Sequence, residues 1–277
     1  VAGVGLIGGS LALAAKRAGL VRHVVGLGRG AANLELARAR GIVDEFSHDP
    51  ATAARGADLL FLAVPVRSLA PVLRACAGSL APGAVVTDAG SVKGAVLAAV
   101  EPELPAGVAF VGGHPIAGGE KAGAAHADAD LFRGQRCVLT PGAAATPAAM
   151  AKVRALWEGV GMEVAEMDAC RHDEILARVS HLPHALAFAL MHAVGDDEVR
   201  GWAGPSFRDL TRIASSPTDV WLDIFLANRD ALRAALAAMA GACADLDRAL
   251  AAGDEPALAA WIEAARRRKL GSDDGSE

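Results

Sequence analysis

The sequence predicts an α/β fold in which a domain built on a parallel sheet is followed by an all-α domain. Short apolar runs alternate with helical patterns over residues 1–168, which is typical of strand–helix–strand units. Beyond residue 168 the strand pattern stops, and Ala and Leu recur at helical spacing. We therefore expect a sheet domain over 1–168, a helical domain over 169–271 and a frayed polar tail over 272–277.

The elements of the expected sheet domain follow one another regularly. The chain opens on the end of a strand, so we expect a few residues to precede it. A continuous apolar run at 58–64 is typical of a strand buried on both faces. The expected strands are Val1–Gly5, Val21–Leu27, Asp58–Val64, Ala84–Asp88, Ala109–Val111, Arg136–Thr140 and Gly161–Met167. The expected helices are Leu6–Ala18, Ala31–Arg40, Thr146–Val160, Glu174–Val194, Pro217–Ala252 and Pro256–Leu270.

Composition excludes several classes of protein. Hydrophobic residues make up 53% of the 277 positions, which is enough for a packed core, and the net charge of −5 argues against a nucleic-acid partner. No run reaches the roughly 18 apolar residues of a membrane helix. The cysteines lie far apart with no CxxC pair, which predicts neither a zinc site nor a disulfide framework and favours a cytoplasmic location. They are Cys76, Cys137, Cys170 and Cys243.

A glycine motif at the first strand–helix turn predicts a dinucleotide site of the Rossmann type. The pattern is G-x-G-x-x-G, and its residues are Gly3, Gly5, Leu6, Ile7 and Gly8. In such turns the first glycine allows the tight turn, the second lets the pyrophosphate approach, and the third allows close helix packing. The helix N-terminus supplies amide donors to the phosphates. A glycine turn that binds nothing is the alternative.

The end of the second strand bears on the choice between NAD and NADP. Sites selective for NAD usually carry Asp or Glu here, whereas this chain has Gly28 followed by Arg29. No carboxylate then repels a 2′-phosphate, and Arg29 either pairs with that phosphate or is a solvated loop charge. Both cofactors stay open. Val64 and Pro65, at the end of the next buried strand, are expected in the same site.

Several segments resemble the prephenate/arogenate dehydrogenases, oxidoreductases of tyrosine biosynthesis. In chain order they are GVGLIGGSLA, DAGSVK, GGHPIAGGEKAG, SHLPHALAFAL and FRDLTRIASS followed by WLDIF. The resemblance spans both expected domains. It implies NAD(P)-dependent oxidation of a ring carbinol on a cyclohexadiene, with loss of the ring carboxylate, so that prephenate gives 4-hydroxyphenylpyruvate or arogenate gives tyrosine.

Two residues are candidates for the chemistry. His114, expected on a glycine-flanked loop, has the ordinary pKa near 6.5 that suits a base for the substrate hydroxyl. Ser91 is expected to hydrogen-bond both the reacting oxygen and the imidazole, or else only to cap the next helix. Lys93 is expected to point away from this site as a surface or helix-end residue.

The substrate's two carboxylates require cationic partners from the helical domain. Arg212 is the candidate for the ring carboxylate because a guanidinium binds it bidentately, and Arg208 lines the same cleft or pairs with Asp209. The resemblance implies that His184 contacts the substrate, with His181 as the other candidate, and that Glu120 lies near the entrance. The two histidines have a spacing that also suits a metal, but no third ligand follows, so no metal is expected.

Two other classes of protein would share this architecture. A β-hydroxyacid or 6-phosphogluconate type of dehydrogenase relies on a lysine in the helical domain, and residues 171–262 contain none. An NAD-sensing regulator would not need Ser91, His114 and Arg212 together. We also expect a homodimer through the helical domain, because the segment Pro217–Ala252 carries more apolar faces than a helical domain of this size can bury internally. The segment includes Trp221, Leu222, Phe225, Leu226, Leu232, Leu236 and Met239.

Overall fold

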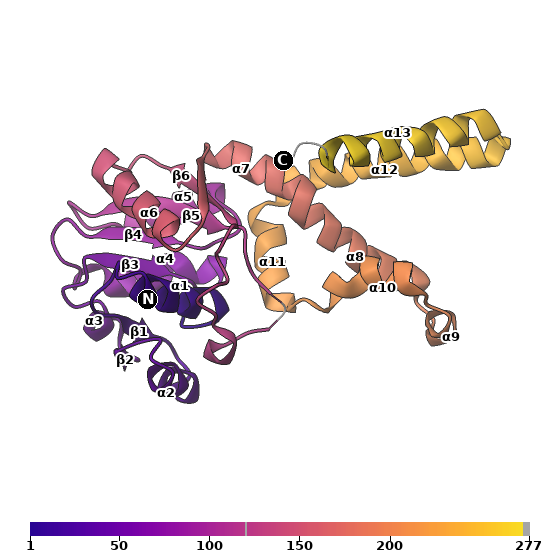
Figure 1. The fold of residues 1–277 in the computed structure, drawn as a ribbon. Helices are drawn as coiled ribbons and strands as arrows, with labels where there is room; N and C mark the ends of the chain where they lie inside the picture. Colours follow the sequence, from indigo (N-terminus) through magenta and orange to yellow (C-terminus); the bar gives the residue numbers. More distant parts are fainter. Residues whose placement is uncertain (120, 274–277) are drawn as a thin grey trace. The chain divides into compact units, whose positions relative to one another are not determined.

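The computed structural model describes residues 1–119 and 121–273, which form two compact units. The first unit is Val1–Arg229, and the second begins at Asp230. The helices that directly follow residue 168 therefore pack in the same unit as the sheet, rather than in a unit of their own (Figure 1).

The sheet is parallel except for one pair of strands. Its order is β2-β1 and β3-β4-β5-β6-β7, and Ala2 joins the two parts through parallel bridges to Leu27 and Leu62. Only β5 and β6 are antiparallel. A parallel return requires a crossover, usually a helix, and the described residues between these strands contain only the short 3₁₀ turn η3 (Ala124–His126). The strands are β1 (Val25–Leu27), β2 (Glu45–Ser47), β3 (Leu59–Leu62), β4 (Val85–Asp88), β5 (Ala109–Pro115), β6 (Arg136–Pro141) and β7 (Glu163–Glu166).

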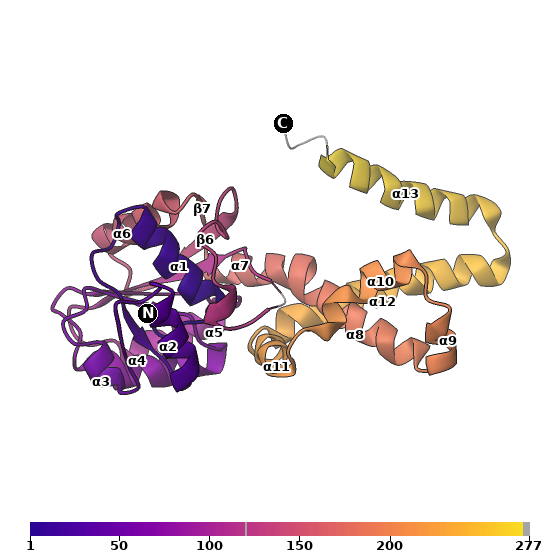
Figure 2. The same cartoon turned by 60° about the horizontal axis from the view of Figure 1, so that its bottom comes forward.

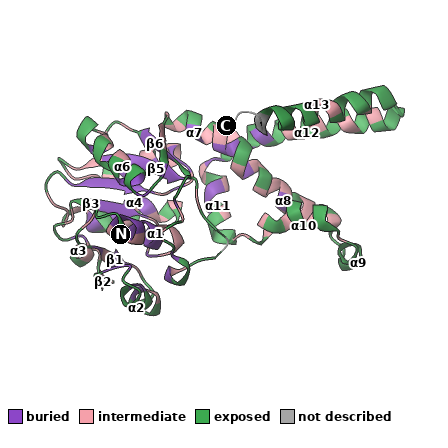
Figure 3. Ribbon diagram, in the orientation of Figure 1, coloured by how far each residue is buried: buried purple, intermediate pink, exposed green. Residues whose placement is uncertain are grey.

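Helices cover both faces of this sheet, as predicted. α1 and α6 pack on one face, where Leu11 belongs to the same core cluster as Phe61 and Trp157 contacts Phe61 edge to face, and α4 and α5 pack on the other. The core side chains of the strands alternate between the faces, and the central strands β3, β4 and β5 are largely buried (Figure 3). The helices are α1 (Leu6–Arg17), α2 (Ala31–Ala39), α3 (Pro50–Ala53), α4 (Leu69–Ala77), α5 (Gly94–Val100) and α6 (Pro147–Gly159), with 3₁₀ turns η1 (Val66–Ser68) and η2 (Glu101–Glu103).

A single bent helical path leads out of the sheet. Asp168 caps α7 by accepting the Arg171 amide, and a π-helical turn joins α7 to α8. Pro183, at the start of α8, has no N–H to donate, and its ring opposes a regular α-turn, which explains the wider turn before it. The remaining elements are α7 (Ala169–Leu176), η4 (Ala177–His181), α8 (Leu182–Val194), α9 (Asp197–Gly201), α10 (Pro205–Thr211), η5 (Arg212–Ser215), α11 (Thr218–Ala227), α12 (Arg229–Ala252) and α13 (Glu255–Asp273).

Two expectations for the C-terminal helices are corrected. The predicted helix Pro217–Ala252 is two helices, α11 and α12, which break at Asn228. α13 extends to Asp273 and runs back from the end of α12 (Figure 2), so residues 272–273 of the expected tail are helical rather than frayed. The rest of the expected tail lies outside the described residues.

The structure also bears on two expectations from the sequence, which concern membrane helices and disulfide bonds. Among residues 1–119 and 121–273, none of the helices has the length and apolarity that crossing a bilayer requires. All four cysteines are thiols, of which Cys76 and Cys137 are buried. The cytoplasmic location stays a prediction.

Candidate active site

The glycine turn is shaped for a close approach of phosphate. Gly3 has φ +90°, and a Cβ there would lie 2.3 Å from the Ala63 carbonyl oxygen. A Cβ on Gly8 would lie 2.1 Å from the Gly3 carbonyl, so only glycine allows this packing of α1. A Cβ on Gly5 would meet nothing within 4 Å. Gly5 is also the N-cap of α1 and provides no side-chain cap, which leaves the first amides of that helix, including those of Leu6 and Ile7, for an anion.

The end of β1 has no acidic residue at the expected ribose position. Gly28 is half-buried against Leu34, and Arg29 is exposed. His48 donates from Nδ1 to the Gly28 carbonyl over 2.8 Å. After β3, Val64 lies against the glycine turn and Pro65 is exposed.

His114 lies on β5 and not on a loop, which corrects the sequence-based expectation. Its two preceding glycines suggested a loop, but they serve close packing in the sheet. A Cβ on Gly112 would lie 2.4 Å from Thr140 Oγ1, and one on Gly113 would lie 2.8 Å from the Asp88 carbonyl oxygen. His114 is buried, with 8% of its surface exposed. Burial, together with the neighbouring His172, Lys93 and His181, holds the pKa of His114 well below its ordinary value.

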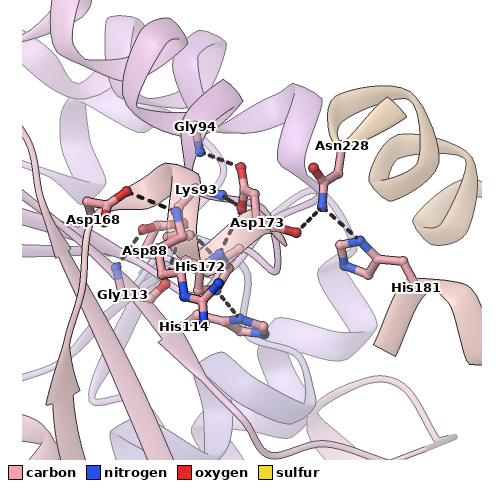
Figure 4. A network of polar contacts seen from close by, with 12 residues as sticks. Asp88, Lys93, Gly94, Gly113, His114, Asp168, His172, Asp173, His181 and Asn228 are labelled. Atoms are coloured by element: carbon pink, nitrogen blue, oxygen red, sulfur yellow. Dashed lines mark hydrogen bonds and ion pairs between the residues drawn. The ribbon is translucent and has the colours of Figure 1, made fainter. Parts of the chain in front are cut away.

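The His114 ring is hydrogen-bonded to His172 rather than to Ser91. His114 Nδ1 and His172 Nε2 are 2.8 Å apart, and His172 Nδ1 is 2.8 Å from Asp173 Oδ1 (Figure 4). Ser91 lies half-buried between β4 and α5, and its hydroxyl makes no hydrogen bond to the imidazole in the described part of the chain. The expected contact of Ser91 with the reacting oxygen stays a prediction.

Lys93 does not point away to the surface, contrary to expectation. Its side chain is fully buried, and Nζ donates to Asp88 Oδ2 over 2.5 Å and to the Gly113 carbonyl over 2.7 Å. Asp88 Oδ1 also accepts the Gly113 amide at 3.0 Å, and its Oδ2 accepts the Gly90 amide at 2.8 Å. A buried ammonium requires such partners, and here they tie the end of β4 to the strand that carries His114.

The two candidate histidines of the helical part have different surroundings. His181 is fully buried, and its Nδ1 accepts a hydrogen bond from the Asn228 amide over 3.1 Å. Burial lowers the pKa of His181 to about 4. His184 is half-buried, donates from Nδ1 to the Ser180 carbonyl over 3.0 Å, and stacks on Trp221 with ring centroids 3.5 Å apart.

Both candidate arginines are exposed, and Arg212 lies close enough to His184 for its charge to act on that ring. Arg212 begins η5, and its charge contributes, after burial, to lowering the pKa of His184. Arg208 on α10 donates to the Ala203 carbonyl over 2.9 Å rather than to Asp209. Glu120 lies outside the described residues.

Comparisons with known proteins identify the family. A model described as the prephenate dehydrogenase nucleotide-binding domain matches residues 11–166, and one described as the prephenate dehydrogenase dimerization domain matches residues 168–264. This chain belongs to the prephenate dehydrogenase family.

Individual members of the family are similar over most of this chain. The cyclohexadienyl dehydrogenase of Zymomonas mobilis is 36% identical over 238 residues, which cover 84% of this chain and 81% of that protein. The prephenate dehydrogenase of Bacillus subtilis is 34% identical over 236 residues, which cover 83% of this chain. The match spans only 64% of the length of that protein. The crystal structure of prephenate dehydrogenase from Aquifex aeolicus, in complex with hydroxyphenyl propionate and NAD+, has a TM-score of 0.92 and 33% identity, covering 98% of this chain and 96% of that one.

Sequence reasoning gave no part in the site to five residues of this member of the prephenate dehydrogenase family, one of which it expected only at the dimer interface. They are Asp88, His172, Asp173, Trp221 and Asn228. The adjacent His172–Asp173 pair near the start of a helix was the signal that could have been used. For a metal, no cluster of three or more His, Cys, Asp or Glu side chains suited to binding one occurs within 1–119 and 121–273.

Proposed function

We propose that this chain oxidises a cyclohexadiene ring carbinol with NAD or NADP and releases the ring carboxylate as CO2, acting on prephenate, arogenate or both. The observation that carries the proposal is the position of His114. It is a buried histidine just beyond the carboxyl end of the parallel pairing between β4 and β5, the edge at which ligands bind in such sheets. The glycine turn follows Ala2, which pairs in parallel with β3 at the same edge.

The residues around the glycine turn fit a dinucleotide. Gly3 and Gly8 allow the tight turn, and the open backbone at Gly5 with the uncapped amides of α1 would hold the pyrophosphate. Val64 and Pro65 would line the same site at the end of β3. When bound, the nicotinamide supplies hydride acceptance. The chain's own residues must therefore position the carbinol and remove its hydroxyl proton.

Proton removal falls to His114. Its lowered pKa keeps the imidazole neutral at pH 7, so a lone pair is available to the substrate hydroxyl as the hydride departs. Ser91, on the adjoining loop, would donate to or accept from the same oxygen. The carboxylate is then vinylogously placed to the resulting ring ketone. As CO2 leaves, its bonding electron pair passes through the ring to the ketone oxygen, which takes up a proton to give the phenol, and aromatisation drives this step without a further catalytic group.

The helical part would bind the substrate's carboxylates. Arg212 is the proposed partner of the ring carboxylate, with Arg208 further out on α10. His184 uses Nδ1 for the Ser180 carbonyl, and His181 uses Nδ1 for Asn228, so each has Nε2 left for the substrate. His184 is half-buried, whereas His181 Nε2 is fully buried and has no hydrogen-bond partner within the described residues. His184 is therefore the better candidate of the two histidines. Glu120 is the proposed residue at the entrance.

The test is the production of NADH or NADPH by the purified chain with prephenate and with arogenate, each with NAD and with NADP. We expect reduced nicotinamide with at least one substrate. A chain that binds NAD but reduces it with neither substrate would overturn the proposal.

Replacing Arg212 with Ala should chiefly raise KM for the substrate. A lost hydrogen bond to a charged group costs about 1.5–3 kcal/mol, and this loss would appear as weaker substrate binding. Steady-state kinetics of Arg212→Ala beside the matched variant Arg208→Ala would check it. An unchanged KM in the first and a raised KM in the second would move the carboxylate site to Arg208.

NADP should be accepted within roughly tenfold of NAD, a difference of about 1.4 kcal/mol. No carboxylate at Gly28 repels the 2′-phosphate, and the exposed Arg29 adds a modest attraction. Arg29→Ala should weaken NADP and leave NAD nearly unchanged, whereas Arg22→Ala, before β1, should affect neither. A preference for NAD beyond a hundredfold in kcat/KM would contradict this account.

The chain should form a homodimer through its helical part. Leu236, Leu250, Trp261, Ile262 and Leu270 of the second unit are exposed in the single chain. Of the residues first expected at the interface, Leu222 and Leu226 are also exposed, but Trp221 stacks on His184 and Leu232 is buried. Sedimentation should give twice the 28.1 kDa chain mass, and the monomer mass at micromolar concentration would refute the dimer.

A further inference from the structure

Three side chains form a continuous line of hydrogen bonds that ends at His114. His114 on β5 contacts His172 on α7, and His172 contacts Asp173, each over 2.8 Å (Figure 4). Both histidine side chains are buried, and Asp173 has 13% of its side chain exposed.

Asp173 is the fixed end of this line. Its Oδ1 accepts the Lys93 amide and its Oδ2 accepts the Gly94 amide, each over 2.8 Å, at the start of α5. Asn228, the C-cap residue of α11, donates from Nδ2 to the backbone carbonyl of Asp173 over 2.8 Å. Burial raises the pKa of Asp173, but the hydrogen bonds from His172 and the two amides outweigh it, so the pKa lies below its ordinary value. The carboxylate is ionised and only accepts hydrogen bonds.

The direction of each hydrogen bond follows from that acceptor. His172 must donate from Nδ1 to Asp173, and a neutral His172 then has only the lone pair of Nε2 for His114. His114 must therefore donate from Nδ1, which leaves its own lone pair on Nε2. We infer that His172 and Asp173 are positioning residues that fix His114 in the tautomer with Nδ1 protonated and Nε2 basic.

The neighbouring titratable groups do not change which ring nitrogen of His114 carries the proton. The ammonium of Lys93 is taken up by Asp88 and the Gly113 carbonyl, and His181 Nδ1 by Asn228. When Nε2 takes the hydroxyl proton, the imidazolium keeps its Nδ1 proton in the bond to His172, and no proton passes along the line. This inference rests on the proposed role of His114 as base, but the tautomer exists without substrate.

The tautomer is measurable directly in the full chain without cofactor. Spectra of protein labelled with ¹⁵N histidine, at pH 8 and so above the ordinary histidine pKa near 6.5, distinguish protonated from unprotonated ring nitrogens. His114→Asn and His172→Gln would assign the signals. We expect a protonated Nδ1 and an unprotonated Nε2 on His114. A protonated Nε2 on His114 in the unaltered protein would overturn the inference, whatever the enzyme's activity.

Kinetics of variants test the consequence for turnover. Asp173→Asn offers an amide N–H where His172 needs an acceptor, so it should favour the wrong tautomer and lower kcat by about 10²–10⁴-fold with NAD affinity unchanged. His172→Gln keeps an acceptor near the Nε2 position and should stay within about tenfold of the parent, whereas His172→Leu should fall well below it. Glu174→Gln, an exposed carboxylate on the same helix, is the control and should change nothing.

The outcomes separate this inference from the proposed function. Equal kcat for His172→Gln and His172→Leu, with equal melting temperatures, would overturn the positioning role. If Asp173→Asn does not fold, the comparison of His172→Gln with His172→Leu and the spectra of the unaltered protein test the inference without it. A protonated Nδ1 in a protein that reduces no NAD with prephenate or arogenate would leave the tautomer standing and remove the proposed function.

Discussion

Replacing His114 with Asn is expected to lower turnover by about 10²–10⁴-fold and to leave NAD affinity unchanged. The Asn side chain places a polar atom near Nδ1 and so retains a partner for His172, but it has no base at the Nε2 position. The glycine turn that would hold the dinucleotide is untouched. Turnover and NAD binding measured on the same preparation would check it.

The pH dependence of the unaltered enzyme belongs to the same prediction. Because burial lowers the pKa of His114, its imidazole stays deprotonated as the pH falls through 6.5. We therefore expect activity to be lost only at a pH below 6.5. We expect kcat/KM to hold from neutral pH to below 6.5. His23→Asn, an exposed histidine before β1, is the matched control. Turnover that survives in His114→Asn would place the base elsewhere.

Replacing Lys93 with Met should lower the free energy of unfolding by about 3–5 kcal/mol. The change leaves the Asp88 carboxylate buried and without its cationic partner, and breaking one half of a buried pair has this typical cost. Turnover should fall as well, because Lys93 also binds the Gly113 carbonyl next to His114. Denaturant unfolding followed by circular dichroism would measure the loss.

Two controls make the Lys93 result specific. Lys152→Met removes a lysine that is 41% exposed beside Asp58, and surface pairs contribute only about 0–1 kcal/mol. Adding Asp88→Asn to Lys93→Met removes the uncompensated charge and should recover part of the loss. A loss below about 1 kcal/mol in Lys93→Met would show that the pair contributes little to the fold.

The parts of the site that depend on neighbouring residues in the chain were predictable. The glycine turn at Gly3–Gly8 is a local pattern at a strand–helix junction, and the parallel sheet with helices on both faces followed from the alternation of elements. The long apolar run around β3 identified a strand buried on both faces.

Features that depend on packing between distant segments were not predictable. Gly112 and Gly113 suggested a loop, because the sequence does not show that Thr140 and Asp88 crowd them in the sheet. Lys93 looked like a surface residue, since its burial depends on how the loop after β4 folds over Asp88.

The line of hydrogen bonds behind His114 could not be predicted for the same reason. The role of His172 follows only from α7 packing beside α5, where Asp173 takes up amides 79 and 80 positions away in the chain. Likewise the break at Asn228 divides a helical pattern that reads as continuous. One sequence shows which residue types are present, but it does not show which of them contact one another in the fold.

We propose that this site removes hydride from a ring carbinol while the ring carboxylate is lost. The direct measurement uses prephenate with deuterium on the carbinol carbon, and follows the label and the released CO2. We predict that deuterium appears in the reduced nicotinamide with one CO2 per transfer, and that His114→Asn slows both together. Reduced nicotinamide without the label, or CO2 release without nicotinamide reduction, would contradict the account.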